Sequence, residues 1–275
     1  MLARASIVAS RFGVGPISVM AYGAVGDGVT DDTAAIQAAL TAARDGSIVF
    51  FPIGLYKITD ELSISTGMIL EGSGSATNLF GVPSARDLAQ QGTQIWQATA
   101  GKAVFLFDCR AASTTKYISD VTIRDMALSA KQDMTADTTP DTNNKYGIKA
   151  IGTWPYGTQR VVFERLTFCH FQFGIYISDT AHDTYDWNFA PASFRNLQFN
   201  FCEQGIAVIS DNFDACVLDT CNWSIPQDGI GINLVRSGFL TLLNCIAGGS
   251  GVGTNSTWLY LDPATCDNVK VIGCQ

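Results

Sequence analysis

The feature that most constrains the fold of this chain is a repeat in the part of the sequence after residue 118. Six segments align on one short pattern, in which a turn-forming position is followed by an apolar position. The segments are residues 121–128, 161–168, 194–199, 217–223, 240–246 and 269–275. The turn position holds Asp125, Arg165, Asn196, Thr220, Asn244 and Gly273. Because Asp, Asn and Gly tolerate a left-handed backbone, the pattern predicts a solenoid whose coils turn at this column.

A second column of residues supports the same interpretation. Nine residues after the turn position come Gly174, Gly205, Gly229 and Gly253. Three of these glycines are followed by Ile, and apolar residues then alternate as they do in a half-buried strand. We therefore expect one strand to follow this glycine in each coil.

The position after the turn is apolar in every repeat. It holds Met126, Leu166, Leu197, Cys221, Cys245 and Cys274. A free thiol in an interior column behaves as a small hydrophobe, so we predict that the three cysteines are free rather than bridged. No CxxC pair and no neighbouring His accompanies them, so no metal site is expected. Free thiols fit a protein that is made in a reducing cytoplasm.

The first quarter of the chain carries another pattern, AYGAVGDGVTDDTAAIQAAL at residues 21–40. Its glycines allow the chain to reverse direction. Asp31 and Asp32 are placed to accept hydrogen bonds from the free N–H groups of a helix predicted over residues 32–43. The sequence F-P-x-G-x-Y at residues 51–56 predicts a type I turn between a hairpin-like pair of strands, residues 48–51 and 56–58. L-x-G-x-G follows at residues 70–74.

These motifs, in this order, resemble the N-terminal signature of the pectate-lyase-like superfamily, which includes rhamnogalacturonase- and epimerase-like domains and many bacteriophage tailspikes. The resemblance implies an all-β fold, a right-handed single-stranded parallel β-helix with an N-terminal capping helix. The chain looks most similar to the body of a phage tailspike depolymerase. That resemblance implies a bacterial surface glycan as substrate, a place in the virion tail and a homotrimer. The motifs themselves specify a fold and carry no chemistry.

The expected organisation follows from these two patterns. Residues 1–16 form an irregular lead-in, residues 17–75 the N-terminal cap, and residues 76–275 the coils with their loop insertions. Residues 76–94 are predicted as a loop, and short strands are expected at residues 95–96 and 104–108. Because the last segment stops partway through a coil, we expect a fragment, or an end that another subunit covers.

Composition excludes several classes of function. The net charge of −8 and pI of about 4.6 argue against binding to nucleic acid or to anionic membranes, which need basic patches. No apolar run approaches the roughly 20 residues that span a bilayer, so membrane insertion is not expected. The first residues lack the apolar core of a signal peptide. No P-loop, dinucleotide fingerprint or zinc motif is present, and no cofactor is expected.

Three insertions between repeats are the candidate sites, because long connections on a rigid scaffold often carry function. They are residues 130–146, residues 151–160 and residues 179–190. The candidate substrate-binding residues in the last two are Trp154, Tyr156, His182, Tyr185 and Trp187. Aromatic rings pack on sugar faces while carboxylates bind hydroxyl groups, so these loops have the composition of a polysaccharide groove. The alternative is a solvated acidic loop whose rings fold back onto the coils.

Hydrolysis of a glycosidic bond needs two carboxyl groups, and stacked coils supply suitable separations. The first candidates for catalysis follow strands on neighbouring coils: Asp183, Asp186, Asp211 and Asp214. The second choice is Glu203 with Asp228, which come just before Gly205 and Gly229. Surface solvation is the commoner role of such residues.

Two other functions stay open at this point. A lyase or epimerase acting on a uronate polymer would need a base, for which Lys149, Arg165, His170 and Arg195 are available, although His170 lies in an aromatic run and is expected to be packed. The polygalacturonase branch is disfavoured because Gly-His-Gly, an adjacent Asp pair in the repeats and Arg-Ile-Lys are absent. The remaining alternative is a non-catalytic receptor-binding or structural tail fibre.

Overall fold

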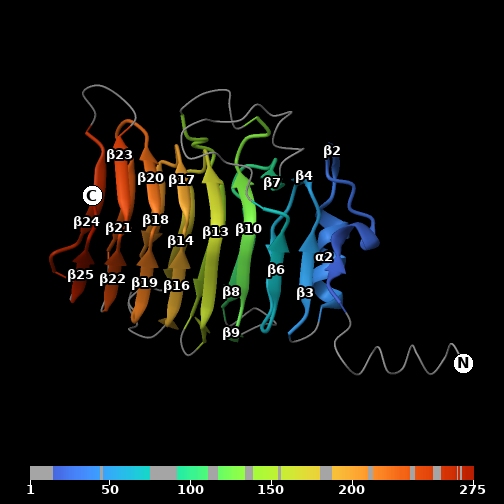
Figure 1. The fold of residues 1–275 in the computed structure, drawn as a ribbon, viewed down its shortest axis with the longest axis horizontal. Coiled ribbons are helices and arrows are strands. Elements are labelled where there is room, and N and C mark those ends of the chain that lie inside the picture. The colour runs from blue at the N-terminus through green and yellow to red at the C-terminus, as the bar shows by residue number, and fades with distance from the viewer. Residues whose placement is uncertain are drawn as a thin grey trace, which may run out of the picture.

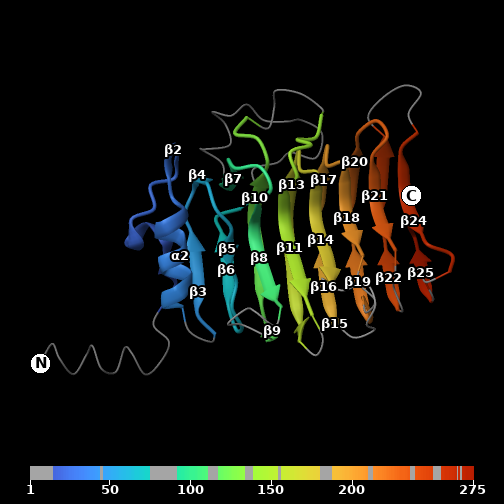
Figure 2. The same cartoon turned by 180° about the vertical axis from the view of Figure 1, so that it is seen from behind.

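The computed structural model describes residues 15–43, 46–74, 92–110, 117–133, 139–153, 156–179, 188–209, 213–235, 239–249, 255–264, 266 and 268–275. Over these ranges the chain is a parallel β-helix, whose coils lie side by side along one axis (Figures 1 and 2). The strands of each coil pair in parallel with those of the coils before and after it. The fold class predicted from the repeat is confirmed.

The strands form three rows along the solenoid and one short sheet. The first row is β1 (Ile17–Ser18), β3 (Ile48–Phe51), β6 (Ile69–Gly72), β10 (Thr122–Ser129), β13 (Val161–Cys169), β16 (Ala192–Arg195), β19 (Cys216–Asp219), β22 (Leu240–Leu243) and β25 (Val269–Ile272). The second row is β2 (Asp27–Asp31), β4 (Gly54–Ile58), β7 (Thr93–Gln97), the C-terminal halves of β10 and β13, β17 (Gln198–Asn200), β20 (Asn222–Ile225) and β23 (Ile246–Gly249). The third row is β5 (Leu62–Ser63), β8 (Ala103–Cys109), β11 (Tyr146–Gly152), β14 (Phe173–Asp179), β18 (Gln204–Val208), β21 (Ile230–Leu234) and β24 (Thr257–Leu261). The short sheet is β9 (Tyr117–Ser119), β12 (Gly157–Gln159) and β15 (Asn188–Phe189).

One α-helix, α2 (Thr33–Ala42), lies at the N-terminal end of the solenoid, beside the 3-10 helix η1 (Val19–Tyr22) (Figure 1). Its residues Ile36, Ala39 and Leu40 are fully buried. A stripe at this spacing covers one face of a helix, so the packing follows from the sequence pattern. The predicted range, residues 32–43, exceeds the observed helix by one residue at each end.

The two aspartates before this helix have different partners. Asp31 Oδ1 accepts a hydrogen bond from the Thr33 amide at 3.1 Å, as predicted. The prediction for Asp32 is wrong, because its carboxylate accepts the amides of Val25 (2.7 Å) and Gly26 (3.0 Å). The glycine-rich reversal that precedes the helix leaves these two amides without strand partners, and buried Asp32 satisfies them.

The strands on either side of residues 51–54 do not form a hairpin. β3 pairs with β1 and β6, and β4 pairs with β2 and β7, always in parallel and always on another coil. The hairpin-like pair is therefore a wrong prediction. The turn instead moves the chain from the first row to the second, so each strand finds its partner in the next coil. Short strands expected at residues 95–96 and 104–108 lie within β7 and β8.

The turn column is confirmed by the backbone. Its six residues all have positive φ angles: Asp125 60°, Arg165 50°, Asn196 52°, Thr220 55°, Asn244 51° and Gly273 65°. Another left-handed position occurs five residues earlier in four of these coils. It holds Asp120, Arg160, Ala215 and Asn268. Each coil thus turns at a fixed place, which keeps the rows in register.

The glycine column is displaced from its predicted position in one coil. β18 pairs with β21 so that Ile206 lies opposite Ile232, and Gly205 therefore corresponds to Gly231 rather than to Gly229. At Gly174 and Gly205 an added Cβ would lie 2.6 Å and 2.5 Å from a carbonyl oxygen of the next coil. A methyl group does not fit there, so the close approach of coils requires glycine. Gly253 lies outside the described residues.

The interior contains rows of stacked side chains. Phe168, Phe199 and Trp223 stack at centroid distances of 4.9 Å and 5.4 Å, with ring planes within 7° and 6° of parallel. Cys221 and Cys245 are buried in the predicted column, and Cys274 is half-buried. All eight cysteines are free thiols, which confirms the prediction for these three.

Candidate functional site

Seven of the predicted site residues lie outside the described part of the chain. These are Trp154, His182, Asp183, Tyr185, Asp186, Trp187 and Asp211. The described candidates are Tyr156, Glu203, Asp214 and Asp228. Two of them, Glu203 and Asp228, lie where the second row leads into the third, and Asp214 lies where the third row leads back to the first. Asp214 therefore lies at the opposite edge of the third row from Glu203 and Asp228.

Asp214 has a structural partner on the next coil. Its Oδ1 accepts a hydrogen bond from the Phe239 amide at 3.2 Å, and its carbonyl oxygen accepts one from Cys216 Sγ at 3.4 Å. The carboxylate thus links two neighbouring coils. This contact occupies one of the oxygens that a catalytic role would need.

Glu203 and Asp228 lie on adjacent coils. The Glu203 carbonyl accepts the Ile230 amide at 2.8 Å, which places Glu203 beside the residues that follow Asp228. Glu203 is half-buried and Asp228 is exposed, with a left-handed φ of 58°. Neighbouring strands are about 4.8 Å apart, which is compatible with the carboxyl separations of glycosidases. Both residues of this second-choice pair thus lie at the same edge of the third row, on adjacent coils.

An aromatic cluster lies next to this edge, on the outward side of the third row. Tyr146 stacks on Phe173 with centroids 5.3 Å apart and planes within 10° of parallel. Tyr176 lies 5.3 Å from Tyr146 and 5.1 Å from Phe173. Phe173 is in register with Gln204, the residue that follows Glu203. We call the outward side of β8, β11, β14, β18 and β21 the aromatic face.

Sequence analysis did not select these three rings, although a signal was available. Tyr146 and Phe173 immediately precede Gly147 and Gly174, two members of the in-register glycine column. Tyr176 follows three residues after Phe173 on the same strand. The candidate binding residues were predicted in the loops, whereas these aromatic residues lie on the strands.

Polar groups complete the aromatic face. Lys149 Nζ lies 4.6 Å from the centroid of the Tyr146 ring, a distance at which a cation and a π system attract each other. Asn233 Nδ2 donates a hydrogen bond to Gln204 Oε1 at 2.9 Å. Tyr260 lies on the coil after Asn233 and is 46% exposed. The face thus combines ring surfaces with amide, hydroxyl and ammonium groups.

The protonation of Tyr146 favours a binding role over that of a base. Burial raises the pKa of its hydroxyl above the ordinary value, and the nearby Tyr176 and Glu61 raise it further. A tyrosine base needs a lowered pKa, because only the phenolate removes a proton. At neutral pH Tyr146 is therefore a neutral hydroxyl that donates and accepts hydrogen bonds.

The outward side of the first row is built from charges. Glu71, Arg124, Glu164, Arg195 and Asp219 lie opposite one another in consecutive coils, so that the sign alternates from strand to strand. Arg124 donates to Glu71 at 2.5 Å. We call the outward side of β6, β10, β13, β16 and β19 the charged face. Its arginines include Arg195, one of the bases that a lyase reading would use.

The other basic candidates are also engaged or buried. Arg165 donates to both carboxylate oxygens of Asp125, at 2.6 Å and 2.8 Å, and contacts Glu164. His170 is 1% exposed, its Nδ1 lies 2.8 Å from the Thr139 carbonyl, and its ring stacks on Phe201. The expectation that His170 is packed is confirmed.

Tyr156, a predicted sugar-binding residue, is partly buried against the core. Its ring meets Tyr117 edge to face, with centroids 5.6 Å apart. Part of the alternative interpretation therefore applies to this residue, because its ring folds back onto the coils. Tyr117 itself is 55% exposed.

Within the described ranges, no three His, Cys, Asp or Glu residues are grouped closely enough to hold a metal ion. The same part of the chain contains no helix with the length and hydrophobicity of a membrane span. Among the described residues, the candidate site consists of the aromatic face and the carboxylates Glu203 and Asp228 at its edge.

Comparison with known families identifies the class of protein. Residues 16–233 match the family model described as rhamnogalacturonase A/epimerase, pectate lyase-like. The match covers more than half of the chain, so this chain belongs to that family.

Three solved structures share the fold. ORF18 of Geobacillus virus E2 is 20% identical, with a TM-score of 0.63, over 98% of this chain and 49% of that one. The A-module of the mannuronan C-5 epimerase AlgE6 of Azotobacter vinelandii is 19% identical, with a TM-score of 0.56, over 93% and 62%. The phiAB6 tailspike, solved in complex with oligosaccharides of the Acinetobacter baumannii surface polysaccharide, is 19% identical, with a TM-score of 0.50, over 98% and 48%. This chain spans about half to three fifths of their lengths.

Similarity to curated sequences is confined to a short segment. A glucan 1,3-beta-glucosidase of Cochliobolus carbonum is 47% identical over 57 residues, which is 20% of this chain and 7% of that protein. A match of this length supports a shared fold signature. It is too short to assign the relative's activity to this chain.

Proposed function

We propose that this chain binds a polysaccharide across the aromatic face and cleaves its glycosidic bonds. The observation that carries the proposal is the position of Tyr146, Phe173 and Tyr176 beside Glu203 and the neighbouring Asp228. Rings of this kind offer apolar surface to the faces of sugar rings, while the polar groups around them bind hydroxyls. Membership of a family named for polysaccharide-active enzymes supports the same function.

In this mechanism Glu203 and Asp228 divide the two roles of a glycosidase. We assign the general acid to Glu203, which is half-buried beside the aromatic face. We assign to Asp228, which is exposed on the adjacent coil, the role of nucleophile or of the base that activates water. The first-choice residues Asp183, Asp186, Asp211 and Asp214 remain the alternative catalytic set, and of these Asp214 lies at the opposite edge of the third row.

The proposed substrate class is a bacterial surface glycan, and the proposed location is the virion tail. Two of the similar structures are viral proteins, and one of these is a tailspike in complex with oligosaccharides of a bacterial surface polysaccharide. A homotrimer, implied by the resemblance to tailspikes, is part of the same proposal.

The test uses a panel of bacterial capsules, O-antigens and plant uronans, with product size measured by chromatography. We expect Glu203→Gln and Asp228→Asn each to slow depolymerisation roughly 100-fold or more, as loss of an acid or base does, while glycan binding persists. Asp219→Asn, on the charged face, is the matched control and should leave the rate unchanged.

Two outcomes would contradict the assignment. Full activity of both the Glu203 and the Asp228 variant, with activity lost in Asp183→Asn or Asp211→Asn, would move the chemistry to the first-choice residues. Binding of a glycan that is never shortened would make the chain a receptor-binding fibre.

A uronate lyase or epimerase is the second candidate, and Lys149 favours it. Its ammonium group lies over the Tyr146 ring on the aromatic face, where it would attract the carboxylate of a uronate. The raised pKa of Tyr146 opposes that tyrosine as the base. A rise in absorbance from unsaturated chain ends, abolished by Lys149→Ala, would establish lyase chemistry in place of hydrolysis.

A further inference from the structure

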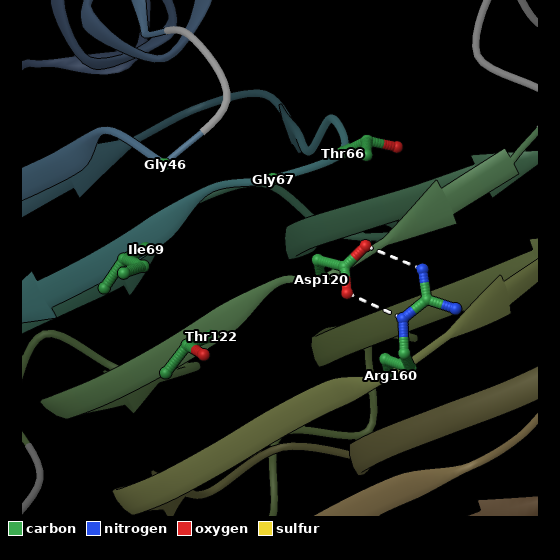
Figure 3. A pocket seen from close by; sticks show the side chains of 7 residues that line it. All are labelled: Gly46, Thr66, Gly67, Ile69, Asp120, Thr122 and Arg160. Atoms are coloured by element: carbon green, nitrogen blue, oxygen red, sulfur yellow. Dashed lines mark hydrogen bonds and ion pairs between the residues drawn. The ribbon is translucent and has the colours of Figure 1, made fainter. Parts of the chain in front are cut away.

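A cavity of about 470 Å³ lies at the N-terminal ends of the first-row strands β3, β6, β10 and β13 (Figure 3). It is lined by Gly46, Thr66, Gly67, Ile69, Asp120, Thr122 and Arg160. The volume falls within the range of small-molecule sites, roughly 300–1,000 Å³. The lining combines two hydroxyl groups, one apolar side chain, one ion pair and two glycines.

The ion pair sets the polarity of this cavity. Arg160 Nε donates to Asp120 Oδ1 and its Nη2 donates to Asp120 Oδ2, both at 2.7 Å (Figure 3). This bidentate contact leaves Nη1 of the guanidinium and further lone pairs of the carboxylate for other partners. Because the pair is neutral overall, it offers donors and acceptors without selecting a charged ligand. Hydroxyl groups, which both donate and accept, match such a surface.

A second pair in the same two coils provides an internal comparison. Asp125 and Arg165 are also bidentate, and they also have left-handed φ angles of 60° and 50°. They line no part of the cavity. Ion pairs between these two coils therefore occur at two positions. Asp120 and Arg160 differ from Asp125 and Arg165 because they line the cavity.

An exposed tyrosine is hydrogen-bonded through its backbone to a residue that lines the cavity. The Tyr117 carbonyl accepts a hydrogen bond from the lining residue Thr66 at 3.0 Å, so the two residues are neighbours. The Tyr117 ring is 55% exposed and is held edge to face by Tyr156. A fixed, exposed ring beside hydrogen-bonding groups is suited to a ligand with one apolar and one polar side.

We propose that this cavity is a second carbohydrate-binding subsite, which holds one neutral, hydroxyl-rich sugar residue. Asp120 and Arg160 bind its hydroxyls, Thr66 and Thr122 line the floor, and the Tyr117 ring covers its apolar side. The proposal extends the function proposed above, because it assigns a second place on the same molecule where a glycan is held. The net charge of −8 disfavours uronates at a subsite without an unpaired cation.

The test is saturation-transfer difference NMR on the full chain with methyl glycosides of glucose, galactose, mannose and glucuronic acid as probes. We expect at least one neutral glycoside to give signals that fall fivefold or more in Arg160→Gln and in Tyr117→Ala. Thr122→Phe keeps both residues of the ion pair but places a large side chain in the cavity, so it should abolish the same signals. The glucuronoside should give the weakest signals.

Controls separate this subsite from the aromatic face and from general loss of structure. Arg165→Gln removes the matched pair outside the cavity and should leave the signals intact. Far-UV circular dichroism checks that each variant is folded. Signals unchanged in Thr122→Phe and Arg160→Gln would overturn the proposal, and so would the absence of signals from every neutral glycoside. Signals lost only in Tyr176→Ala would assign sugar binding to the aromatic face alone.

Discussion

The charged face and the aromatic face are built by the same stacking of coils, yet they leave their side chains in different states. On the charged face opposite charges lie in register on neighbouring coils, from Glu71 through Arg124 and Glu164 to Arg195, and Arg124 forms an ion pair with Glu71. On the aromatic face, Tyr146, Phe173 and Tyr176 contact one another but keep ring surface outward. A face whose groups satisfy one another fixes register, whereas a face that presents unused surface is suited to a ligand.

The largest expected effect concerns the glycine column at the border of the aromatic face. In Gly205→Ala the new Cβ would lie 2.5 Å from the Gly231 carbonyl oxygen and 2.4 Å from Trp223 Nε1. We expect the free energy of unfolding to fall by roughly 3 kcal/mol, as overpacking of a tight interior does. Urea unfolding measures it. Gly248→Ala, where nothing lies within 4 Å, is the control, and an equal loss in both variants would show that backbone spacing is not limiting.

A smaller effect is expected when the charge alternation is broken. Glu164→Lys places a positive charge in register between Arg124 and Arg195. The same substitution removes the carboxylate that pairs with Arg165. Because these groups are partly exposed, we expect a loss of about 1 kcal/mol in the free energy of unfolding at low salt, and less at 1 M NaCl. Glycan affinity should not change. A loss of affinity equal to that of Tyr176→Ala would contradict the division between the two faces.

The smallest effect is the pH dependence of one ion pair. The hydrogen bonds from Arg160 and Ser119 lower the pKa of Asp120 to about 2. A carboxyl with a lowered folded-state pKa contributes stability above its unfolded pKa, near 4, and loses it as the pH falls toward 2. The melting temperatures of the wild type and Asp120→Asn should therefore differ at pH 7, and the difference should narrow from about pH 4 and vanish only as the pH falls through 2. A difference that stays constant over this range would show that ionisation of Asp120 contributes nothing.

The fold was predictable because a solenoid repeats its constraints in every coil. The left-handed turn at Asn196 and Asn244 and the interior thiols of Cys221 and Cys245 were visible as columns in the sequence. The hairpin at residues 51–54 was predicted wrongly, because local turn chemistry does not reveal whether the next strand pairs with its neighbour or with another coil. The shift from Gly229 to Gly231 arises because the distance from the left-handed turn to the glycine differs between coils.

The site was less predictable, since the outward aromatic residues recur over too few coils to form a long column. Phe173 and Tyr176 differ from the residues at the equivalent positions in the next coil, Gln204 and Ala207. Only the register brings these rings together beside Glu203. The expectation that loops carry the chemistry also led attention to residues 180–187, which lie outside the described part of the chain.

The interior stack of Phe168, Phe199 and Trp223 has a consequence for how perturbations travel. Each ring contacts the ring of the neighbouring coil at 4.9–5.4 Å, so a change of volume at one position shifts the next. Substitutions at Phe168 and Trp223 should therefore be non-additive in a double-mutant cycle, although only Phe199 joins them. Energetic coupling in this molecule runs along the solenoid axis, across the direction of the chain, and links residues that are far apart in sequence into one cooperative unit.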